Sequence, residues 1–266
     1  MSLLQLTSPD GRSIAAVSTF GARIVRWTCG GRERIFTPAA LADDERTAPH
    51  GGVPVLHPQF GFFGGGRKHG LVRDREWKIK SHCADAATLS VQLGADVADG
   101  APYDVELHVV LSNTTLSMEL VITNAGHETV EFTCGLHTYL RVDEIADSVL
   151  LGLERTPYLD ALENLAISAP SNEDLSAPIN VDRVYVDAPM RLQLDCRDAS
   201  LAITQSGFAD TVVWNPGALI SSRFTDLAGD EWRQFVCVEA AQIKPAVQLA
   251  AGTRWCGSQR LEAIDL

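Results

Sequence analysis

A single carboxylate stands in the middle of an apolar run near the end of the chain. The run is FVCVEAA, residues 235–241, and the carboxylate belongs to Glu239. An ionised carboxylate without a partner is among the costliest groups to bury. Glu239 is therefore either paired within a core or kept there for chemistry. In the second case, burial would raise its pKa toward the range that suits a general base.

A second candidate is His137, in the segment CGLHTYLRV at residues 134–142. If the segment is extended, Gly135, His137 and Tyr139 share a face, and the glycine leaves room for a ligand to approach. An imidazole can give or take a proton near neutral pH. A single histidine is also common as a satisfied core or surface residue, and the chain has six others.

The third candidate is the stretch HGGVPVLHPQFGFFGGGRKHGLVRDREW, residues 50–77. Its glycines and prolines favour tight turns, and its aromatic residues could wall a pocket. Its basic residues could hold an anion such as a phosphate; they are Arg67, Lys68, His69 and Arg73. The alternative is a solvent loop with solvated charges. Asp182, in INVDRVYVDAP, is a weaker candidate, because an aspartate at a strand entry often serves only a turn.

The remaining pattern predicts the elements that position these residues. Short runs with two-residue alternation, separated by turn signals, predict an all-β fold: a large antiparallel β-sandwich with few short helices, built as a single domain over residues 1–266. FVCVEAA reads as a central strand with Phe235, Cys237 and Glu239 on one face. Short helices are predicted near residues 41–46 and 222–227. Residues 50–75 are predicted to form a long functional loop.

Composition limits the partners. The net charge is −12, which argues against nonspecific binding to nucleic acid or to an anionic membrane. The N-terminus lacks signal-peptide features, and no apolar run approaches the roughly 20 residues of a membrane helix. The six cysteines form no CxxC pair and show no metal-ligand spacing with histidine. We expect reduced, mostly buried cysteines in a cytoplasmic protein.

Taken in order, these pieces resemble one known family. GGVPVLHPQFG, HGLVRDREW, FTCGLHTYLRV, VDRVY, VVWNP, FVCVEAA and the tail LAAGTRWCGSQRL are similar to the hexose-6-phosphate 1-epimerases of the aldose 1-epimerase, or galactose mutarotase, superfamily. The resemblance extends from about residue 15 to 262. It implies interconversion of the α and β anomers of a sugar, and a sandwich with its site in a cleft on one concave sheet.

The resemblance also implies roles for individual residues. Glu239 would be the base that takes the proton of the C1 hydroxyl, and His137 the acid that protonates the ring oxygen. His69 would hold the ring, Arg73 would bind the phosphate, and Asp182 would bond sugar hydroxyls. We expect Glu239 and His137 to face each other across a space the size of one pyranose. The family needs no metal and no cofactor, so a sugar or sugar phosphate is the expected partner of a monomer or weak homodimer.

Three positions depart from the family pattern. His50 stands where the family typically has arginine, Lys68 where it often has glutamine, and His57 where it has an aromatic residue. The acid and base are kept while the phosphate end is altered, with Lys68 and His50 as candidate substrate contacts. We therefore expect the reaction to be retained and the substrate preference to differ. An aldose 1-epimerase acting on free hexoses and a non-catalytic carbohydrate-binding protein are the alternatives.

Overall fold

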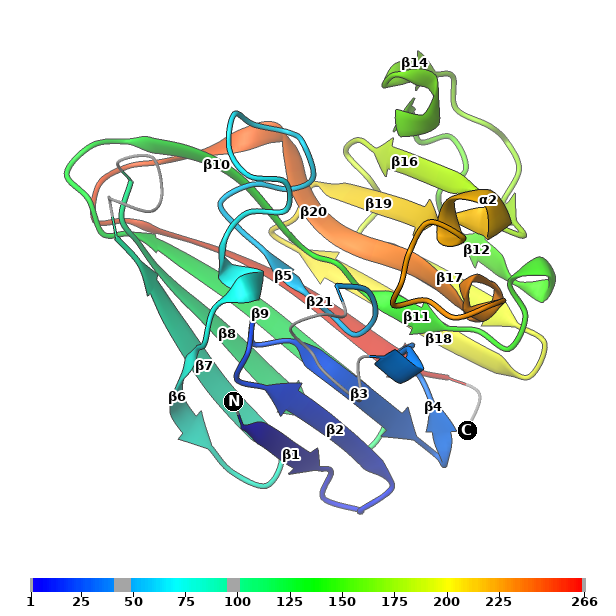
Figure 1. Cartoon of the computed structure of the whole chain (residues 1–266), viewed down its shortest axis with the longest axis horizontal. Helices are drawn as coiled ribbons and strands as arrows, with labels where there is room; N and C mark the ends of the chain where they lie inside the picture. The colour runs from blue at the N-terminus through cyan, green and yellow to red at the C-terminus, as the bar shows by residue number, and fades with distance from the viewer. Residues whose placement is uncertain (1, 41–48, 95–100, 265–266) are drawn as a thin grey trace.

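The structure, a computed structural model, describes residues 2–40, 49–94 and 101–264. Its strands form three sheets, and the strand pairings within them are antiparallel. The two larger sheets make the layers of a β-sandwich, and the small sheet lies beside them (Figure 1). The prediction of an all-β antiparallel sandwich is confirmed.

The eight-stranded sheet carries the site. Its order along the sheet is β14 (Ala166–Ser168), β13 (Tyr158–Asp160), β16 (Val181–Tyr185), β19 (Asp210–Asn215), β20 (Phe235–Leu249), β10 (Val130–Leu136) and β5 (Val55–Leu56), with β11 (Tyr139–Arg141) also paired to β20. The long strand β20 is therefore bonded to β19 on one side and to β10 and β11 on the other.

The other two sheets support this one. The nine-stranded sheet has the order β15 (Leu175–Ser176), β12 (Val149–Leu151), β17 (Arg191–Cys196), β18 (Ala199–Ser206), β21 (Arg254–Ala263), β9 (Thr115–Asn124), β8 (Tyr103–Leu111), β7 (Ala86–Leu93) and β6 (Lys78–His82). The small sheet consists of β1 (Leu3–Thr7), β2 (Ser13–Ser18), β3 (Ile24–Cys29) and β4 (Arg32–Glu33). One hydrophobic cluster joins all three sheets, for example through Leu6, Leu107 and Val238.

Helical segments are short. The described ranges contain the α-helix α2 (Gly217–Ser221) and the 3₁₀ turns η1 (Val72–Asp74), η2 (Ile145–Asp147), η3 (Ala161–Glu163) and η4 (Glu231–Gln234). None of the helices in these ranges combines the length and apolar character that crossing a bilayer demands.

One helix prediction is wrong, and the other falls outside the described residues. The helix predicted at residues 222–227 ends before it: α2 occupies Gly217–Ser221, and Ser222 is its C-cap. The Asn215 side chain accepts a hydrogen bond from Gly217 N–H and so starts the helix early. Asp226 is instead bound to His50, which keeps that segment out of a helix. The helix predicted near residues 41–46 lies in the range that is not described.

Alternate side chains of β20 belong to different hydrophobic clusters, one on each face of the strand, as predicted. Val236, Val238 and Ala240 join the main core between the sheets. Phe235 and Cys237 belong to a second cluster on the opposite face, with Tyr139, Phe36 and Leu227. Glu239 shares that second face and is only 2% exposed. The strand therefore places its single carboxylate on the outer face of the sheet, under the loop that contains residues 57–75.

Candidate active site

Side chains from four strands line up on the outer face of the eight-stranded sheet. Asp182 on β16 is opposite Trp214 on β19, Trp214 is opposite Cys237 on β20, and Cys237 is opposite Tyr139 on β11. Residues directly opposite each other in antiparallel strands share a face. Glu239 follows Cys237 by two positions and so continues on that face.

His137 and Glu239 meet at the centre of this face. The distance from His137 Nδ1 to Glu239 Oε1 is 3.5 Å, and the exposed fractions of the two side chains are 10% and 2%. His137 also stacks on Tyr139, with ring centroids 4.8 Å apart and planes 8° apart. The expectation of a pyranose-sized gap between acid and base is wrong, because the two groups are in contact. Both groups come from segments paired to one another, β20 and the β10–β11 junction, which leaves no such space.

Burial controls the charge of this pair. Desolvation, followed by the repulsion of Asp182, raises the pKa of Glu239 well above its ordinary value. Desolvation also lowers the pKa of His137 well below its ordinary value, and nearby His69 and Arg73 lower it further. The raised pKa of Glu239 confirms the prediction from its apolar surroundings. In the sugar-free site, the neutral form of each group is therefore favoured.

The loop brings His69 beside His137. The two ring centroids are 5.5 Å apart, and burial lowers the pKa of His69 to about 3. The loop returns on itself because the His57 carbonyl accepts a hydrogen bond from Leu71 N–H at 2.8 Å. Gly70 makes this possible: it has φ +72°, and a Cβ there would lie 2.2 Å from the His57 oxygen.

His57 takes the place of an aromatic packing residue. It is fully buried, its ring meets Tyr103 and Phe132 edge-on at centroid distances of 4.5 and 4.9 Å, and burial lowers its pKa to about 3. Neither ring nitrogen has a hydrogen-bond partner within the described part of the chain. A cavity of about 1400 Å³ lies next to this segment, lined by residues such as Gln59 and Thr133, and neither His137 nor Glu239 lines it.

Lys68 and Asp182 lie near Glu239 with opposite charges. Burial raises the pKa of Asp182 to about 6, although attraction to Lys68 opposes the rise. Lys68 itself is exposed, and its ammonium group lies 4.8 Å from the Phe62 ring centroid. Asp182 and Lys68 therefore both lie close enough to Glu239 to change its pKa.

Replacing Asp182 with asparagine is expected to stabilise the protein at neutral pH. Between pH 4 and 6 the folded state holds more protons at Asp182 than the unfolded state does, so the ionised group lowers stability as pH rises through that window. Asp182→Asn should gain about 1–3 kcal/mol at pH 7.5 and nearly nothing below pH 4. Thermal unfolding at both pH values measures this. The exposed Glu173→Gln variant should show no such pH dependence, and a variant less stable than wild type at pH 7.5 would contradict the argument.

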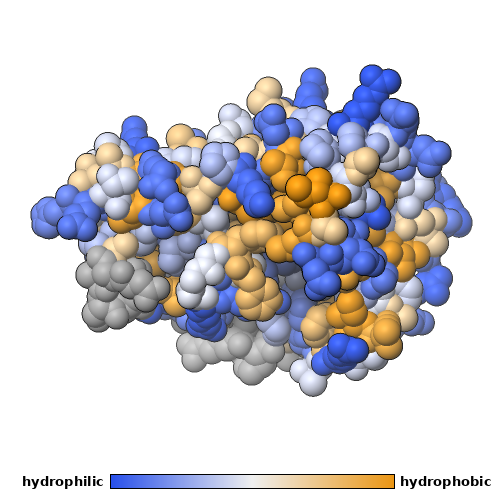
Figure 2. Space-filling view, turned by 90° about the horizontal axis from the view of Figure 1, so that it is seen from above, coloured by the Kyte–Doolittle hydropathy of each residue, from blue (hydrophilic) through white to orange (hydrophobic). Residues whose placement is uncertain are grey.

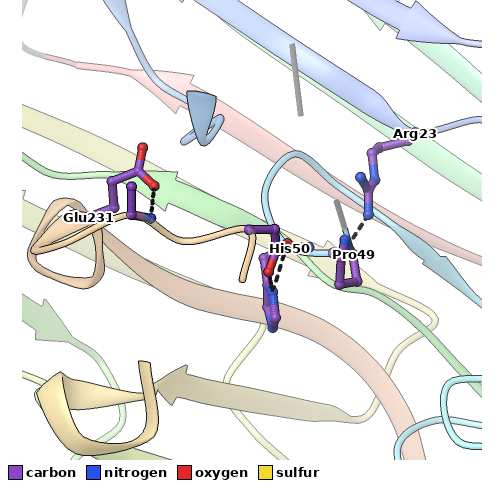
Figure 3. Close-up of polar contacts among 6 residues, drawn as sticks. Arg23, Pro49, His50 and Glu231 are labelled. Carbon is purple, nitrogen blue, oxygen red and sulfur yellow. Dashed lines mark hydrogen bonds and ion pairs between the residues drawn. The ribbon is translucent and has the colours of Figure 1, made fainter. Parts of the chain in front are cut away.

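Two arginines reach the site from different directions. Arg73, in η1, is partly buried, with 21% of its side chain exposed. Arg23, which the sequence analysis did not single out, is 8% exposed and donates a hydrogen bond to the Pro49 carbonyl at 2.8 Å (Figure 3). Both lie close enough to His137 to lower its pKa. Nothing in the segment GARIVRW distinguishes Arg23 from any strand arginine, because its neighbours at the site are distant in the chain.

His50 is held by an acid that sequence reasoning also missed. Its Nδ1 lies 2.9 and 3.0 Å from the two Asp226 carboxylate oxygens, and its backbone N–H donates to the same carboxylate (Figure 3). Burial tends to raise the pKa of Asp226, but the His50 bonds outweigh it and leave that pKa below its ordinary value. The ring also stacks on Trp214 at 5.9 Å. His50 is thus fixed at the margin of the site.

Gln259 connects the segments of His137 and Glu239 from the opposite sheet. It lies on β21, is fully buried, and donates through Nε2 to the Val238 carbonyl at 3.0 Å. Its Oε1 accepts from the Thr138 hydroxyl at 2.5 Å. Val238 precedes Glu239 and Thr138 follows His137, so one side chain fixes the spacing of the pair.

Gln259→Leu is expected to lower both stability and kcat. It removes the Gln259 bonds to the Val238 carbonyl and to the Thr138 hydroxyl, which keeps a 3.4 Å bond to the Leu136 carbonyl. The loss should cost about 2–4 kcal/mol of unfolding free energy. Loss of the spacing should lower kcat by about 10- to 100-fold. Denaturant unfolding and a rate assay measure the two effects. Gln205→Leu is the matched control: the buried Gln205 side chain bonds Asp210 and Thr211 on β19, so its loss should cost stability without the loss in kcat. Equal kcat in the two variants would refute a spacing role.

Comparison with known proteins identifies the class of enzyme. The sequence model of the family described as aldose 1-epimerase matches residues 2–262. This match makes the protein an isomerase that interconverts the anomers of a sugar. The chain belongs to the aldose 1-epimerase family.

The relatives and solved structures agree with this assignment. The chain is 26% identical to a protein of Cenchrus ciliaris that carries the provisional name glucose-6-phosphate 1-epimerase, over 94% of this chain and 81% of the relative. A protein of the same provisional name from Escherichia coli K12 is 27% identical, over 85% and 79%. The crystal structure of a protein from Salmonella typhimurium, provisionally named a mutarotase, superposes with TM-score 0.86 at 21% identity, over 98% of this chain and 90% of that one. That structure shares the fold.

Proposed function

We propose that the enzyme interconverts the anomers of a hexose 6-phosphate, with Glu239 and His137 as the acid–base pair. The observation that carries this proposal is their 3.5 Å contact in a buried site surrounded by cationic side chains. The chain has a net charge of −12, yet Arg23, Lys68 and Arg73 all act electrostatically on the pair or its neighbours. A local cationic cluster in an acidic protein suits a phosphate-bearing substrate.

One face of the molecule exposes apolar surface that suits a sugar ring. Figure 2 views the molecule from the side where the loop, β14 and α2 lie in Figure 1, and shows apolar surface gathered among hydrophilic residues. Each of these three elements exposes a large apolar side chain: Phe62, Ile167 and Leu219. Because the pair is in contact, the substrate must lie over both groups and not between them. His69, Asp182 and His50 are proposed to contact its hydroxyls or phosphate.

In the proposed reaction the pair holds one transferable proton, which is on His137 before ring opening; a proton is on Glu239 after it. Glu239 takes the C1 hydroxyl proton while His137 gives a proton to the ring oxygen; the C1–O5 bond breaks and C1 becomes an aldehyde. Rotation about C1–C2 presents the other carbonyl face, and the same steps in reverse close the ring. Ring opening thus converts ionised Glu239 and protonated His137 into two neutral groups. Burial favours that neutral form, so the site stabilises the pair while the sugar is open.

A direct test is anomer exchange measured by NMR on glucose 6-phosphate and on glucose. Faster exchange of the phosphorylated sugar per enzyme supports the proposal. Exchange of free glucose alone would assign the site to unphosphorylated aldoses, and exchange of neither above the spontaneous rate would point to a non-catalytic carbohydrate-binding protein.

Arg73→Met is expected to weaken binding of the phosphorylated sugar selectively. Loss of charge-assisted bonds to phosphate costs about 1.5–3 kcal/mol, so KM for glucose 6-phosphate should rise by about 10- to 150-fold. KM for glucose should change less. Arg67→Met is the matched control, because Arg67 is exposed on the same loop and pairs with Asp74. An equal rise in both KM values would show that Arg73 does not bind phosphate.

The cellular setting is also part of the proposal. All six cysteines lie within the described residues, and none forms a disulfide. Cys29, Cys134 and Cys237 are buried, whereas Cys83 and Cys256 are exposed. Cysteines outside disulfides, two of them exposed, support a reducing compartment such as the cytoplasm. We further propose a monomer or weak homodimer, which sedimentation of the purified protein would test.

A further inference from the structure

Three side chains with metal-binding atoms converge at the catalytic pair. One ligand atom each from His137, Cys237 and Glu239 lie within 4.8 Å of one another, and all three residues are buried. The convergence follows from the strands: Cys237 and Glu239 are two apart on one face of β20, and Tyr139, two residues after His137, is opposite Cys237. A nitrogen, a sulfur and a carboxylate oxygen form a donor set typical of zinc.

Two atoms of this set have no other partner. Glu239 Oε2 and His137 Nδ1 are buried without a hydrogen-bond partner within the described residues. Buried polar atoms of this kind generally have a partner, so two such atoms on residues in contact indicate a site able to receive a ligand. Tetrahedral zinc would hold its ligand atoms about 3.3–3.7 Å apart. Side-chain rotations that bring the three ligand atoms about 1 Å closer together would therefore give the spacing that zinc needs.

We propose that a thiophilic divalent cation such as Zn²⁺ binds His137, Cys237 and Glu239 and inhibits the enzyme by occupying both catalytic groups. The proposal rests on the proposed function for its consequence, since the cation competes with the sugar for the acid and the base. Three protein ligands are one fewer than the four of tetrahedral zinc, so water or another small ligand would complete the set. Hard cations such as Mg²⁺, which prefer oxygen ligands, do not suit a site with a thiol and an imidazole.

The alternative is that Cys237 is a packing residue of the apolar cluster and binds no metal. It packs in an apolar cluster with Phe36, Tyr139, Leu227 and Phe235, where a cysteine can serve as a small hydrophobic residue. Cys237→Ser keeps the size of the side chain and removes the soft ligand. Because Cys237 lies on the face of the candidate site, the rate of this variant without metal is measured first, and its inhibition is expressed relative to that rate.

The experiment compares inhibition of full-length variants by Zn²⁺ and by Cd²⁺. Wild type, Cys83→Ser and Cys256→Ser should be inhibited alike, because Cys83 and Cys256 are exposed and lie outside the cluster. Cys237→Ser should need at least about 10-fold more metal, since even loss of a residue that supports a ligand costs about 10- to 100-fold in metal affinity. Mg²⁺ should have no effect. Unchanged inhibition of Cys237→Ser, or no inhibition of wild type, would overturn the proposal.

A second measurement does not depend on activity. Cd²⁺ bound by a thiolate gives an ultraviolet charge-transfer absorption, which should appear in wild type and in the Cys83→Ser, Cys256→Ser double variant. It should be lost in Cys237→Ser and weakened in Glu239→Gln. If this absorption follows the expected pattern while anomer exchange is absent, the metal site stands and the proposed function fails. If exchange is present and the absorption is unchanged in Cys237→Ser, the metal site fails alone.

Discussion

Replacing Glu239 with glutamine is expected to lower kcat for anomer exchange by about 10²- to 10⁴-fold, the usual contribution of a general acid or base. An amide cannot accept the C1 hydroxyl proton. The fold should be kept, because burial already favours the uncharged carboxyl in the sugar-free protein and the amide has nearly the same shape. NMR exchange spectroscopy measures the rate, and thermal unfolding measures the stability.

The control for this variant is Glu131→Gln. Glu131 is exposed on the adjacent strand β10, and its replacement should leave the rate unchanged. A Glu239→Gln enzyme that keeps the wild-type kcat would remove Glu239 from the acid–base pair. A variant that unfolds would indicate that Glu239 is a structural core residue, the alternative that its apolar sequence context left open.

Replacing His137 with alanine is expected to produce a loss of similar size, about 10²- to 10⁴-fold in kcat. Without the imidazole, water alone must protonate the ring oxygen. His137→Gln preserves more of the stacking on Tyr139 and so separates loss of the acid from loss of packing. His127→Ala, at an exposed position, is the control.

The two catalytic replacements are also informative together. Residues that act as one unit show strongly non-additive effects. The double variant Glu239→Gln, His137→Ala should therefore be little slower than either single variant. Losses that multiply would show that the two groups act independently, in spite of their contact at 3.5 Å.

The sequence predicted which residues of β20 share a face, because the alternation of side chains along a strand is local information. Two-residue alternation placed Phe235, Cys237 and Glu239 on one face, and the clusters of the structure confirm it for Phe235 and Cys237. The same alternation, with its turn signals, predicted the β-sandwich, and the family resemblance added the reaction. The single-domain prediction is supported by a core shared among the three sheets and remains a prediction.

What the sequence could not predict depends on contacts between distant segments. Gln259 reaches Thr138 and Val238 from the other sheet, and Arg23 reaches the loop at Pro49. The helix predicted at residues 222–227 failed because Asp226 bonds His50, which is 176 residues away. The expected gap between acid and base failed for the same reason, because strand register sets their separation. The roles of His69, Arg73, Asp182, Lys68 and His50 remain predictions.

The residues proposed for proton transfer and those proposed for sugar binding lie in parts of the chain with different backbone structure. Glu239 belongs to a strand hydrogen-bonded on both sides, whereas His69 and Arg73 belong to a segment that returns on itself through Gly70. Because His69 and Arg73 also lower the pKa of His137, variation within residues 57–75 is expected to change the protonation of His137 together with any effect on the choice of sugar.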